Sequence, residues 1–323
     1  MAGGVNAEIQ RVVAVDWSGD KGPGQRKKIW AGVWTASTAR VALESGRTRE
    51  ELFAWLVERS RETPRMVVGI DCCFSFPGWF LAEHGCDTVF DFWRHVASGQ
   101  GEQWLARECE EVARDERFWG KPHKRPEQFC GAGLHRSMRA TDMENKITPK
   151  MLEGDPERAA KVKGITPKSP FQIGGSGSVG TGSLRAMPFL LRLREAGFRV
   201  WPFESSTVAG KRPAPLVVEM YTRLLTGAVK KSNPVARREY LLAKKKVDGA
   251  YSGLYSRLPR GVVAKAMGSE DAFDALVCCM EMVLWREEFA GLRATRDEVL
   301  RLEGITWRPG VGGSSTLKVE GGR

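Results

Sequence analysis

The sequence lacks long uninterrupted apolar segments. No apolar run approaches the roughly 18–20 residues that a membrane-spanning helix needs. The residues from Met1 to Glu8 also lack the basic start and apolar stretch of a secretory signal. We therefore expect a cytoplasmic protein with no membrane partner.

Paired-cysteine motifs are also missing. The chain has 7 cysteines, an odd number, and no Cys-x-x-Cys. Two adjacent cysteine pairs lie inside apolar runs, where a reduced cysteine packs as a small hydrophobic side chain. A disulfide framework is therefore not expected. His123, Cys130 and His135 do not have the spacing of a standard zinc site.

Positive charge is in clear excess. Lysine and arginine total 50 against 39 acidic residues, which gives a net charge of +11 and a pI of about 9.4. Such a balance favours a polyanionic partner, and nucleic acid is the commonest one. A basic surface without a dedicated ligand is the alternative. The sequence gives no indication of the oligomeric state.

The first part of the chain predicts a β-β-β-α-β order. Thr48 and Glu51 have the spacing of a capping box, which places the start of the helix. Short β-branched and apolar runs predict the strands, at 11–16, 28–34, 39–43 and 66–71.

The remaining chain predicts one domain over 11–308, with a large, mostly helical insertion at about 78–170. Residues 1–10 are expected to form a flexible arm, and 309–323 a disordered tail rich in Gly and Ser. Further elements are expected after the insertion: helices at 184–196, 235–246 and 270–289, and strands at 198–201 and 215–221.

Acidic residues occur where apolar elements end or begin. Asp16 and Asp71 each end a predicted strand, and Glu219 lies in a late apolar strand. Asp271 and Asp274 are three residues apart and share one face of the last long helix. The carboxyl ends of neighbouring parallel strands meet at one sheet edge, so these carboxylates would repel one another without a cation. Mg²⁺ or Mn²⁺ suits such oxygen ligands. Taken singly, each residue could instead be a turn cap, a helix-dipole partner or half of an ion pair.

The same residues carry a resemblance to a known family. The segments concerned are Val15–Gly19, Gly69–Pro77, Lys168–Arg185, Val218–Tyr221 and Glu270–Ala275, which together span about residues 11–285. In their order they resemble the ribonuclease H-like nuclease family catalogued as domain of unknown function 429.

The resemblance implies an α/β ribonuclease H-like core, in which strands one to three form a meander and strands four and five add in parallel, with flanking helices. It also implies metal-dependent hydrolysis, with Asp16, Asp71, Glu219 and Asp274 as catalytic metal ligands and Asp271 as the rival for the last place. One departure is Thr222, where the family commonly has proline.

Two regions are candidate contacts for a nucleic-acid backbone. A glycine loop precedes the helix at 184–196, and loop amides of this kind can bind phosphate. The segment 230–246 holds seven basic residues and one acid. A flexible hinge and a solvated helix face are the respective alternatives. The candidate contact residues are Lys168, Ser176, Ser178, Arg185, Arg237, Arg238, Lys244 and Lys245.

These features favour a metal-dependent nuclease that hydrolyses phosphodiester bonds of DNA or RNA. One alternative is a non-catalytic nucleic-acid-binding module of the same fold. A second is a nucleotide phosphotransferase of the actin or sugar-kinase type, because Asp16–Gly19 resembles the first phosphate loop of those proteins. The sequence does not discriminate DNA from RNA.

Overall fold

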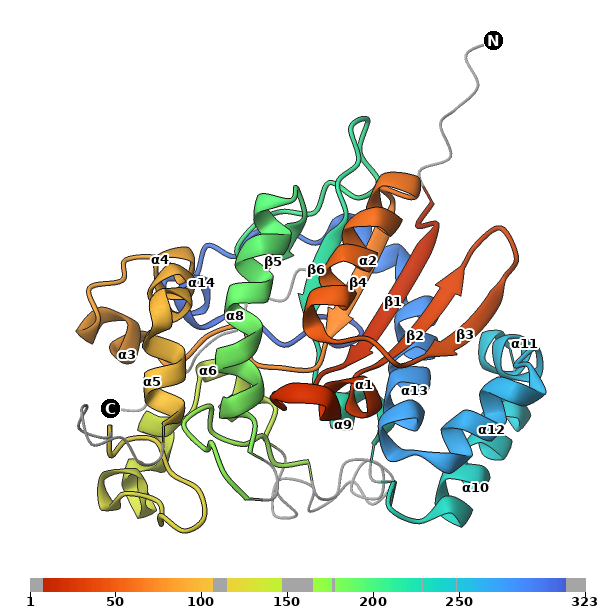
Figure 1. The fold of residues 1–323 in the computed structure, drawn as a ribbon. Coiled ribbons are helices and arrows are strands. Elements are labelled where there is room, and N and C mark those ends of the chain that lie inside the picture. Colours follow the sequence, from red (N-terminus) through yellow and green to blue (C-terminus); the bar gives the residue numbers. More distant parts are fainter. Residues whose placement is uncertain are drawn as a thin grey trace, which may run out of the picture.

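A six-stranded mixed sheet forms the centre of the molecule (Figure 1). The computed structural model describes residues 8–106, 115–146, 165–175, 178–227, 229–247 and 249–311. The strand order is β3-β2-β1-β4-β6-β5. The strands are β1 (Arg11–Asp16), β2 (Trp30–Thr35), β3 (Arg40–Glu44), β4 (Met66–Ile70), β5 (Arg199–Trp201) and β6 (Leu216–Glu219).

The first three strands form the expected antiparallel meander. β4 then pairs with β1 in parallel, and β6 pairs with β4 in parallel. β5 adds a parallel edge strand beyond β6. The α/β class and this mixed sheet are as the sequence predicts.

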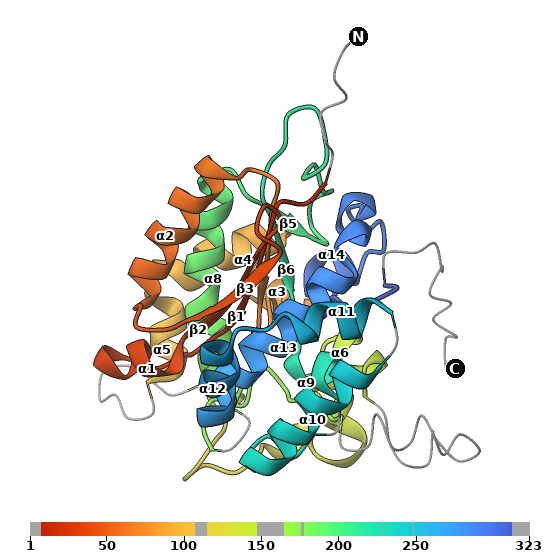
Figure 2. The ribbon, with the colours of Figure 1, turned by 90° about the vertical axis from the view of Figure 1, so that its right-hand side faces the viewer.

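Helices cover both faces of the sheet (Figure 2). α2 (Arg49–Glu62) and α8 (Gly180–Glu195) lie on one face, and α13 (Glu270–Leu284) lies on the other. The predicted capping box of α2 is present, because Thr48 and Glu51 exchange both hydrogen bonds. The other α-helices are α1 (Gln25–Lys28), α3 (Gly78–Glu83), α4 (Val89–His95), α5 (Gly101–Leu105), α6 (Ala140–Glu144), α9 (Thr222–Thr226), α10 (Pro234–Lys246), α11 (Ala250–Ser256), α12 (Arg260–Gly268) and α14 (Leu300–Glu303).

Short helical turns of other types also occur in the described part of the chain. They are η1 (Gly22–Gly24), η2 (Val96–Gln100), η3 (Glu127–Phe129), η4 (Gly131–Ser137) and η6 (Arg286–Gly291). Within the described residues, no helix combines the length and apolar character that crossing a membrane would take.

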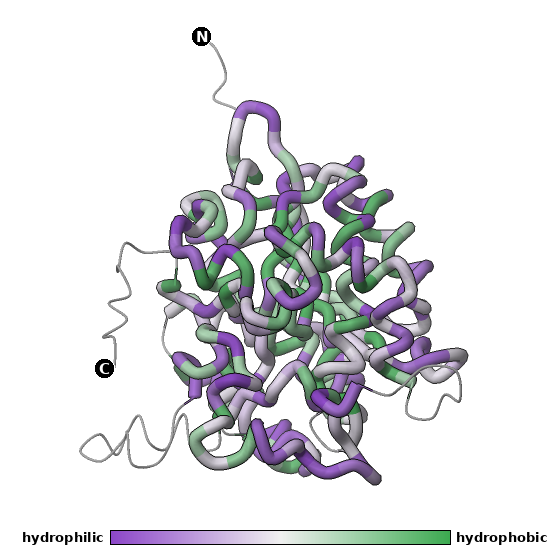
Figure 3. Tube along the Cα trace, turned by 90° about the vertical axis from the view of Figure 1, so that its left-hand side faces the viewer, coloured by the Kyte–Doolittle hydropathy of each residue, from purple (hydrophilic) through white to green (hydrophobic). Residues whose placement is uncertain are grey.

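Apolar side chains divide between the two faces of the sheet, as strand alternation requires. Val13 and Val15 pack in the cluster beneath α2 and α8, whereas Val12 and Ala14 pack in the cluster beneath α13. Figure 3 shows hydrophobic segments concentrated in the interior and hydrophilic ones on the outside. Each face of the sheet therefore has its own core.

Several predicted boundaries differ from the structure. α8 begins at Gly180 rather than at 184, and the last long helix ends at Leu284 rather than at 289. The predicted arm at 1–10 is packed at its end, since Ile9 is buried and Gln10 N donates to Arg65 O. Residues 1–7 and 312–323, which include most of both predicted flexible ends, lie outside the described residues.

Candidate functional site

Asp16 and Asp71 lie side by side at one edge of the sheet. β1 and β4 are parallel, with Val15 level with Ile70. The hydrogen-bond ladder continues one step further, because Asp71 N donates to Val15 O at 3.1 Å. Adjacent strands are about 4.8 Å apart. The two aspartates that end these apolar runs therefore meet, as the sequence predicts.

Both aspartates belong to the α13 face of the sheet. Asp16 follows Val12 and Ala14 in the alternation, and these two residues pack beneath α13. Asp71 follows Gly69, where an added Cβ would lie 2.7 Å from the Met282 sulfur on α13. The pleat therefore directs both carboxylates towards the side on which α13 begins.

α13 brings two further carboxylates, Asp271 and Asp274, in its first two turns. The Ser269 side chain caps this helix by accepting from Ala272 N. Close packing on β2 fixes the helix position, since a Cβ at Gly32 would lie 2.3 Å from Ala275 O. The structure thus brings Asp16 and Asp71 close to both candidates on α13.

The electrostatics of these carboxylates show that they share one small, poorly solvated space. Burial, and then the charges of Asp274 and Asp71, raise the pKa of Asp16 well above its usual range. Burial and the charge of Asp274 raise the pKa of Asp71 to about 7. Burial raises the pKa of Asp274 to about 6 despite an opposing lysine. The pKa of Asp271 is also raised, first by burial and then by Glu270. Without a cation, the ionised cluster is therefore unfavourable.

Lys231 is the one basic group that bonds directly to a carboxylate of this cluster within the described residues, and its Nζ donates to Asp274 Oδ2. Asp274 Oδ1 is buried and has no hydrogen-bond partner among the described atoms. An unpartnered buried carboxylate oxygen beside two other repelling carboxylates fits a hard divalent cation such as Mg²⁺ or Mn²⁺. The set of donors is entirely oxygen, so the residues present fit the expected metals.

Glu219 does not join this cluster. It is level with Ile70 on the neighbouring strand, and Ile70 packs on the opposite face from α13. Its two oxygens accept hydrogen bonds at 2.6–2.7 Å, from both terminal nitrogens of Arg139, from Thr306 Oγ1 and from Phe74 N. These four bonds fill the lone-pair sites of an ionised carboxylate. The structure thus makes Glu219 the acceptor of a buried ion pair.

Cys73, Asp142 and Glu219 place their ligand atoms within 4.8 Å of one another, which is compatible with a metal. However, Arg139 already donates to both Asp142 oxygens at 2.9 Å as well as to Glu219. Burial also raises the pKa of the Cys73 thiol. The guanidinium therefore supplies the positive charge that this second group needs.

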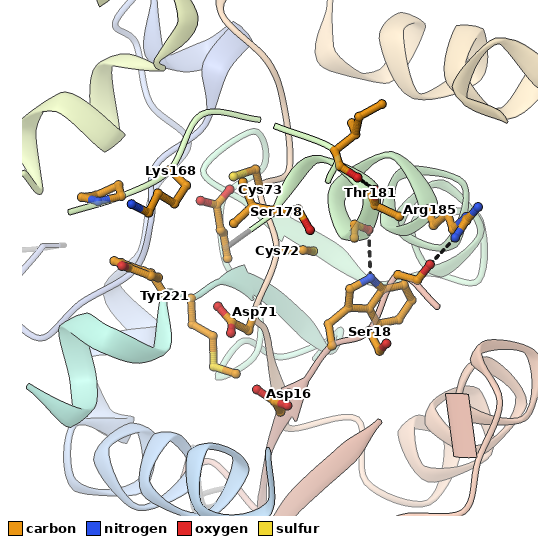
Figure 4. Close-up of a pocket in the computed structure, with 18 of the residues that line it drawn as sticks. Asp16, Ser18, Asp71, Cys72, Cys73, Lys168, Ser178, Thr181, Arg185 and Tyr221 are labelled. Atoms are coloured by element: carbon orange, nitrogen blue, oxygen red, sulfur yellow. Dashed lines mark hydrogen bonds between the residues drawn. The ribbon is translucent and has the colours of Figure 1, made fainter. Parts of the chain in front are cut away.

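A cleft of about 910 Å³ opens above the strand ends (Figure 4). Asp16, Asp71 and Asp271 line it, whereas Asp274 is not among the described lining residues. Among the described residues, six carboxylates and four basic groups line the cleft, namely Asp16, Asp20, Asp71, Asp142, Glu219 and Asp271 against Lys28, Arg139, Lys168 and Arg185. The cleft is thus acidic in a protein whose net charge is +11.

The glycine loop and the segment after β1 form one wall of the cleft. Trp17 Nε1 donates to Gly182 O at 2.9 Å, and Arg185 donates to Gly19 O. A Cβ at Gly19 would lie 2.6 Å from Gly182 N, so only glycine permits this approach. The wall is therefore held by direct contacts between two distant segments of the chain.

The predicted nucleic-acid contacts divide into four groups, of which Arg237 and Lys244 form the last. Lys168, Ser178 and Arg185 line the cleft, although Arg185 also pairs with Glu102 at 2.9 Å. Arg238 and Lys245 lie on α10, and Ser176 lies outside the described residues.

Arg237 and Lys244 are placed differently from the prediction. Arg237 is 4% exposed, and its guanidinium donates to the carbonyls of Lys231 and Met267. Lys244 pairs with the buried Glu281 at 2.9 Å. Both side chains therefore stabilise the packing of α10, and Arg237 in particular is not available to a nucleic acid.

Sequence reasoning missed Arg139, Lys231 and Tyr221 as residues of this region. Arg139 had no signal apart from Asp142 three residues later, and Lys231 was hidden in a basic run. Tyr221 lies two residues after Glu219 and, like Asp71, lines the cleft.

Comparison with known proteins gives no assignment, because no family model, curated protein or solved structure matches the chain.

Proposed function

We propose that this protein is a metal-dependent nuclease that hydrolyses phosphodiester bonds of DNA or RNA. The observation that carries the proposal is the convergence of Asp16, Asp71 and the two α13 aspartates on one face of adjoining parallel strands. The raised pKa values of these residues are typical of a functional carboxylate cluster. The cleft above them is large enough for a nucleotide-sized group.

The sheet topology supports a ribonuclease H-like assignment. An antiparallel meander of β1 to β3, followed by β4 and β6 in parallel, is the arrangement that this resemblance implies. The strand β5 at the far edge is additional. The fold supports the function only by analogy, so the proposal depends on the carboxylates.

The metal would be held by Asp16 and Asp71, with Asp274 or Asp271 completing the protein ligands. A bound Mg²⁺ or Mn²⁺ would supply Lewis acidity for an attacking water and charge neutralisation for the phosphate. Glu219 does not belong to this set, because its oxygens already accept four hydrogen bonds. Its role in the proposal is to hold Phe74 N, three residues after Asp71.

The charge of the cleft implies an order of binding. Carboxylates outnumber basic groups among its described lining residues. Because the pKa values of Asp16 and Asp71 are raised, protons offset part of this charge in the metal-free cleft. A bound divalent ion would replace those protons and add the positive charge that attracts a phosphate. Lys168 and Lys28, which line the same cleft, would then orient the substrate backbone.

The test is cleavage of labelled single-stranded, duplex and branched DNA and RNA in Mg²⁺, Mn²⁺ or EDTA. We expect cleavage that requires metal and is lost in the Asp16→Asn/Asp71→Asn variant. The Asp87→Asn/Glu127→Gln variant makes the same change in charge at exposed positions outside the cleft and should cleave like the wild type. Metal-independent binding without cleavage would instead favour the non-catalytic binding module.

The phosphotransferase alternative receives less support. Those proteins contain two copies of the fold, whereas the described residues form one six-stranded sheet. ATP hydrolysis or phosphate transfer that depends on Asp16 would support the phosphotransferase over the nuclease.

A further inference from the structure

Two side chains of the cleft have no polar partner among the residues that the structure describes. Tyr221 is half-buried, and within the described residues no hydrogen bond involves its hydroxyl and no ring packs against its own. Lys168 is exposed and makes no ion pair with any described residue. Figure 4 shows both on the same side of the cleft.

The backbone around Tyr221 is firmly held, so its ring is presented from a rigid support. Met220 N donates to Ile70 O at 3.1 Å, and Thr222 N donates to Asp71 Oδ1 at 3.4 Å. Met220 and Thr222 are buried on either side of it. The aromatic ring is thus tied to the same backbone that positions Asp71.

The opposite wall of the cleft cannot easily move outwards. The contacts of Trp17 with Gly182 and of Arg185 with Gly19 join the two segments that form it. The volume of about 910 Å³ lies within the range of sites that enclose a small ligand. A base inside a duplex is already stacked on its neighbours, so only an unpaired base has a face free to contact an aromatic side chain in the cleft.

We propose that the cleft binds an unpaired nucleotide of a single-stranded nucleic acid, with its base stacked on Tyr221 and a flanking phosphate at Lys168. Stacking on an aromatic ring tolerates any base, because every base has a π-face. The inference rests on the proposed nuclease function and names its substrate class. In this proposal Tyr221 selects unpaired strands, and the carboxylates hold the metal.

The test measures binding by fluorescence anisotropy in Ca²⁺, which takes the same kind of oxygen ligands. One probe is a labelled single strand, and the other is a duplex of the same sequence closed at both ends by a non-nucleotide linker, so that it has no unpaired base. We expect the single strand to bind at least about 10-fold more tightly. Equal or tighter binding of the closed duplex, or no binding of either probe, would overturn the inference.

Variants separate stacking from other roles of the tyrosine. Tyr221→Leu should weaken single-strand binding about 10-fold, whereas Tyr221→Phe keeps the ring and should bind like the wild type. Lys168→Gln should reduce the slope of log affinity against log salt concentration by about 1, the amount expected for the loss of one phosphate contact. The control Arg40→Gln removes an exposed charge on β3, outside the cleft, and should change neither quantity. Unchanged binding by Tyr221→Leu would also contradict the inference.

This experiment distinguishes failure of the inference from failure of the proposed function. Single-strand binding that depends on Tyr221, but without cleavage in Mg²⁺ or Mn²⁺, would support the substrate class and reject the nuclease. Metal-dependent cleavage that prefers the closed duplex would support the nuclease and reject the substrate class.

Discussion

Asp71 occupies an unfavourable position for a charged residue. It is flanked by Asp16 across the strand pair and faces Asp274, and burial together with that charge raises its pKa to about 7. Within the described residues, its carboxylate accepts one backbone hydrogen bond, from Thr222 N at 3.4 Å. A proline at position 222 would have no amide hydrogen to donate there.

Neutralising Asp71 should stabilise the metal-free protein. We expect Asp71→Asn to raise the free energy of unfolding by about 1 kcal/mol in EDTA, because it removes repulsion among buried carboxylates. The same variant should lose the increase in melting temperature that Mn²⁺ gives the wild type. Thermal melts with and without Mn²⁺ measure both effects, and a large fall in the EDTA melting temperature would show that Asp71 is a structural cap.

Replacing Glu219 should have the opposite consequence. Glu219→Gln leaves the buried Arg139 guanidinium without one of its two charge partners, so we expect a loss of about 3–5 kcal/mol. Glu62→Gln, in an exposed pair with Arg59, should cost no more than about 1 kcal/mol.

The response of Glu219→Gln to metal decides its role. If Glu219 only supports the site, Mn²⁺ should still raise the melting temperature of the folded variant. If the variant is as stable as the wild type but Mn²⁺ no longer raises its melting temperature, Glu219 is a metal ligand.

Sequence alone could identify Asp16 and Asp71, because each ends an apolar run and parallel strand ends meet. It could not assign Glu219 to a face. That assignment depends on the register of β4 and β6, and a shift of one residue would reverse it. Lys231 and Arg139 were equally hidden, since their partners Asp274 and Glu219 are far away in the sequence.

At the scale of elements, the packing of α13 on β2 sets the distance between the strand-end carboxylates and those on the helix. Gly32 makes this packing possible, because any side chain there would collide with the backbone of Ala275. The position of Asp271 and Asp274 therefore depends on a glycine in a neighbouring strand.

Gly32→Ala should displace α13. We expect a loss of about 1–3 kcal/mol in stability from overpacking, together with weaker Mn²⁺ binding. Gly253→Ala in α11 is the matched control, since an added Cβ there meets nothing within 4 Å and should stabilise the helix by up to about 1 kcal/mol. Denaturant unfolding and Mn²⁺ titration test this prediction. Unchanged metal affinity in Gly32→Ala would show that the position of α13 does not affect the metal site.

Elements with strong local signals were predicted well, and those held by distant contacts were not. The capping residue Thr48 located the start of α2, and the predicted helix at 270–289 begins where α13 does. The start of α8 was missed because its first turn contains Gly180 and Gly182, which are poor helix formers. Gly180 N instead donates to Gln172 O, a contact that only the folded loop provides.

At the scale of the whole molecule, the net charge of +11 did not indicate where charges gather. The basic run of α10 contributes partly to packing, through Arg237 and Lys244, and the cleft itself is acidic. Overall charge therefore favours a polyanionic partner without identifying the surface that would bind it.

The acidic cluster should make stability depend on pH. Asp71 and Asp274 have folded pKa values of about 7 and about 6, both above the unfolded value, so between pH 4 and 7 the folded state binds more protons. In EDTA, their contribution to stability should therefore decrease as the pH rises from about 4 to 7. Saturating Mn²⁺ should remove this decrease, because the ion replaces the protons. Melting temperatures across this range, compared with Asp71→Asn, isolate the cluster, and a pH dependence that the variant leaves unchanged would assign it to other groups.

The most direct test of the account is a calorimetric titration of Mn²⁺ into the wild type and into Asp16→Asn/Asp71→Asn. The account predicts saturable binding to the wild type that weakens as the pH falls below 7 and is absent from the double variant, with Asp87→Asn/Glu127→Gln binding normally. Equal Mn²⁺ affinity in the wild type and the double variant would contradict the central claim that these two strand-end aspartates hold the metal.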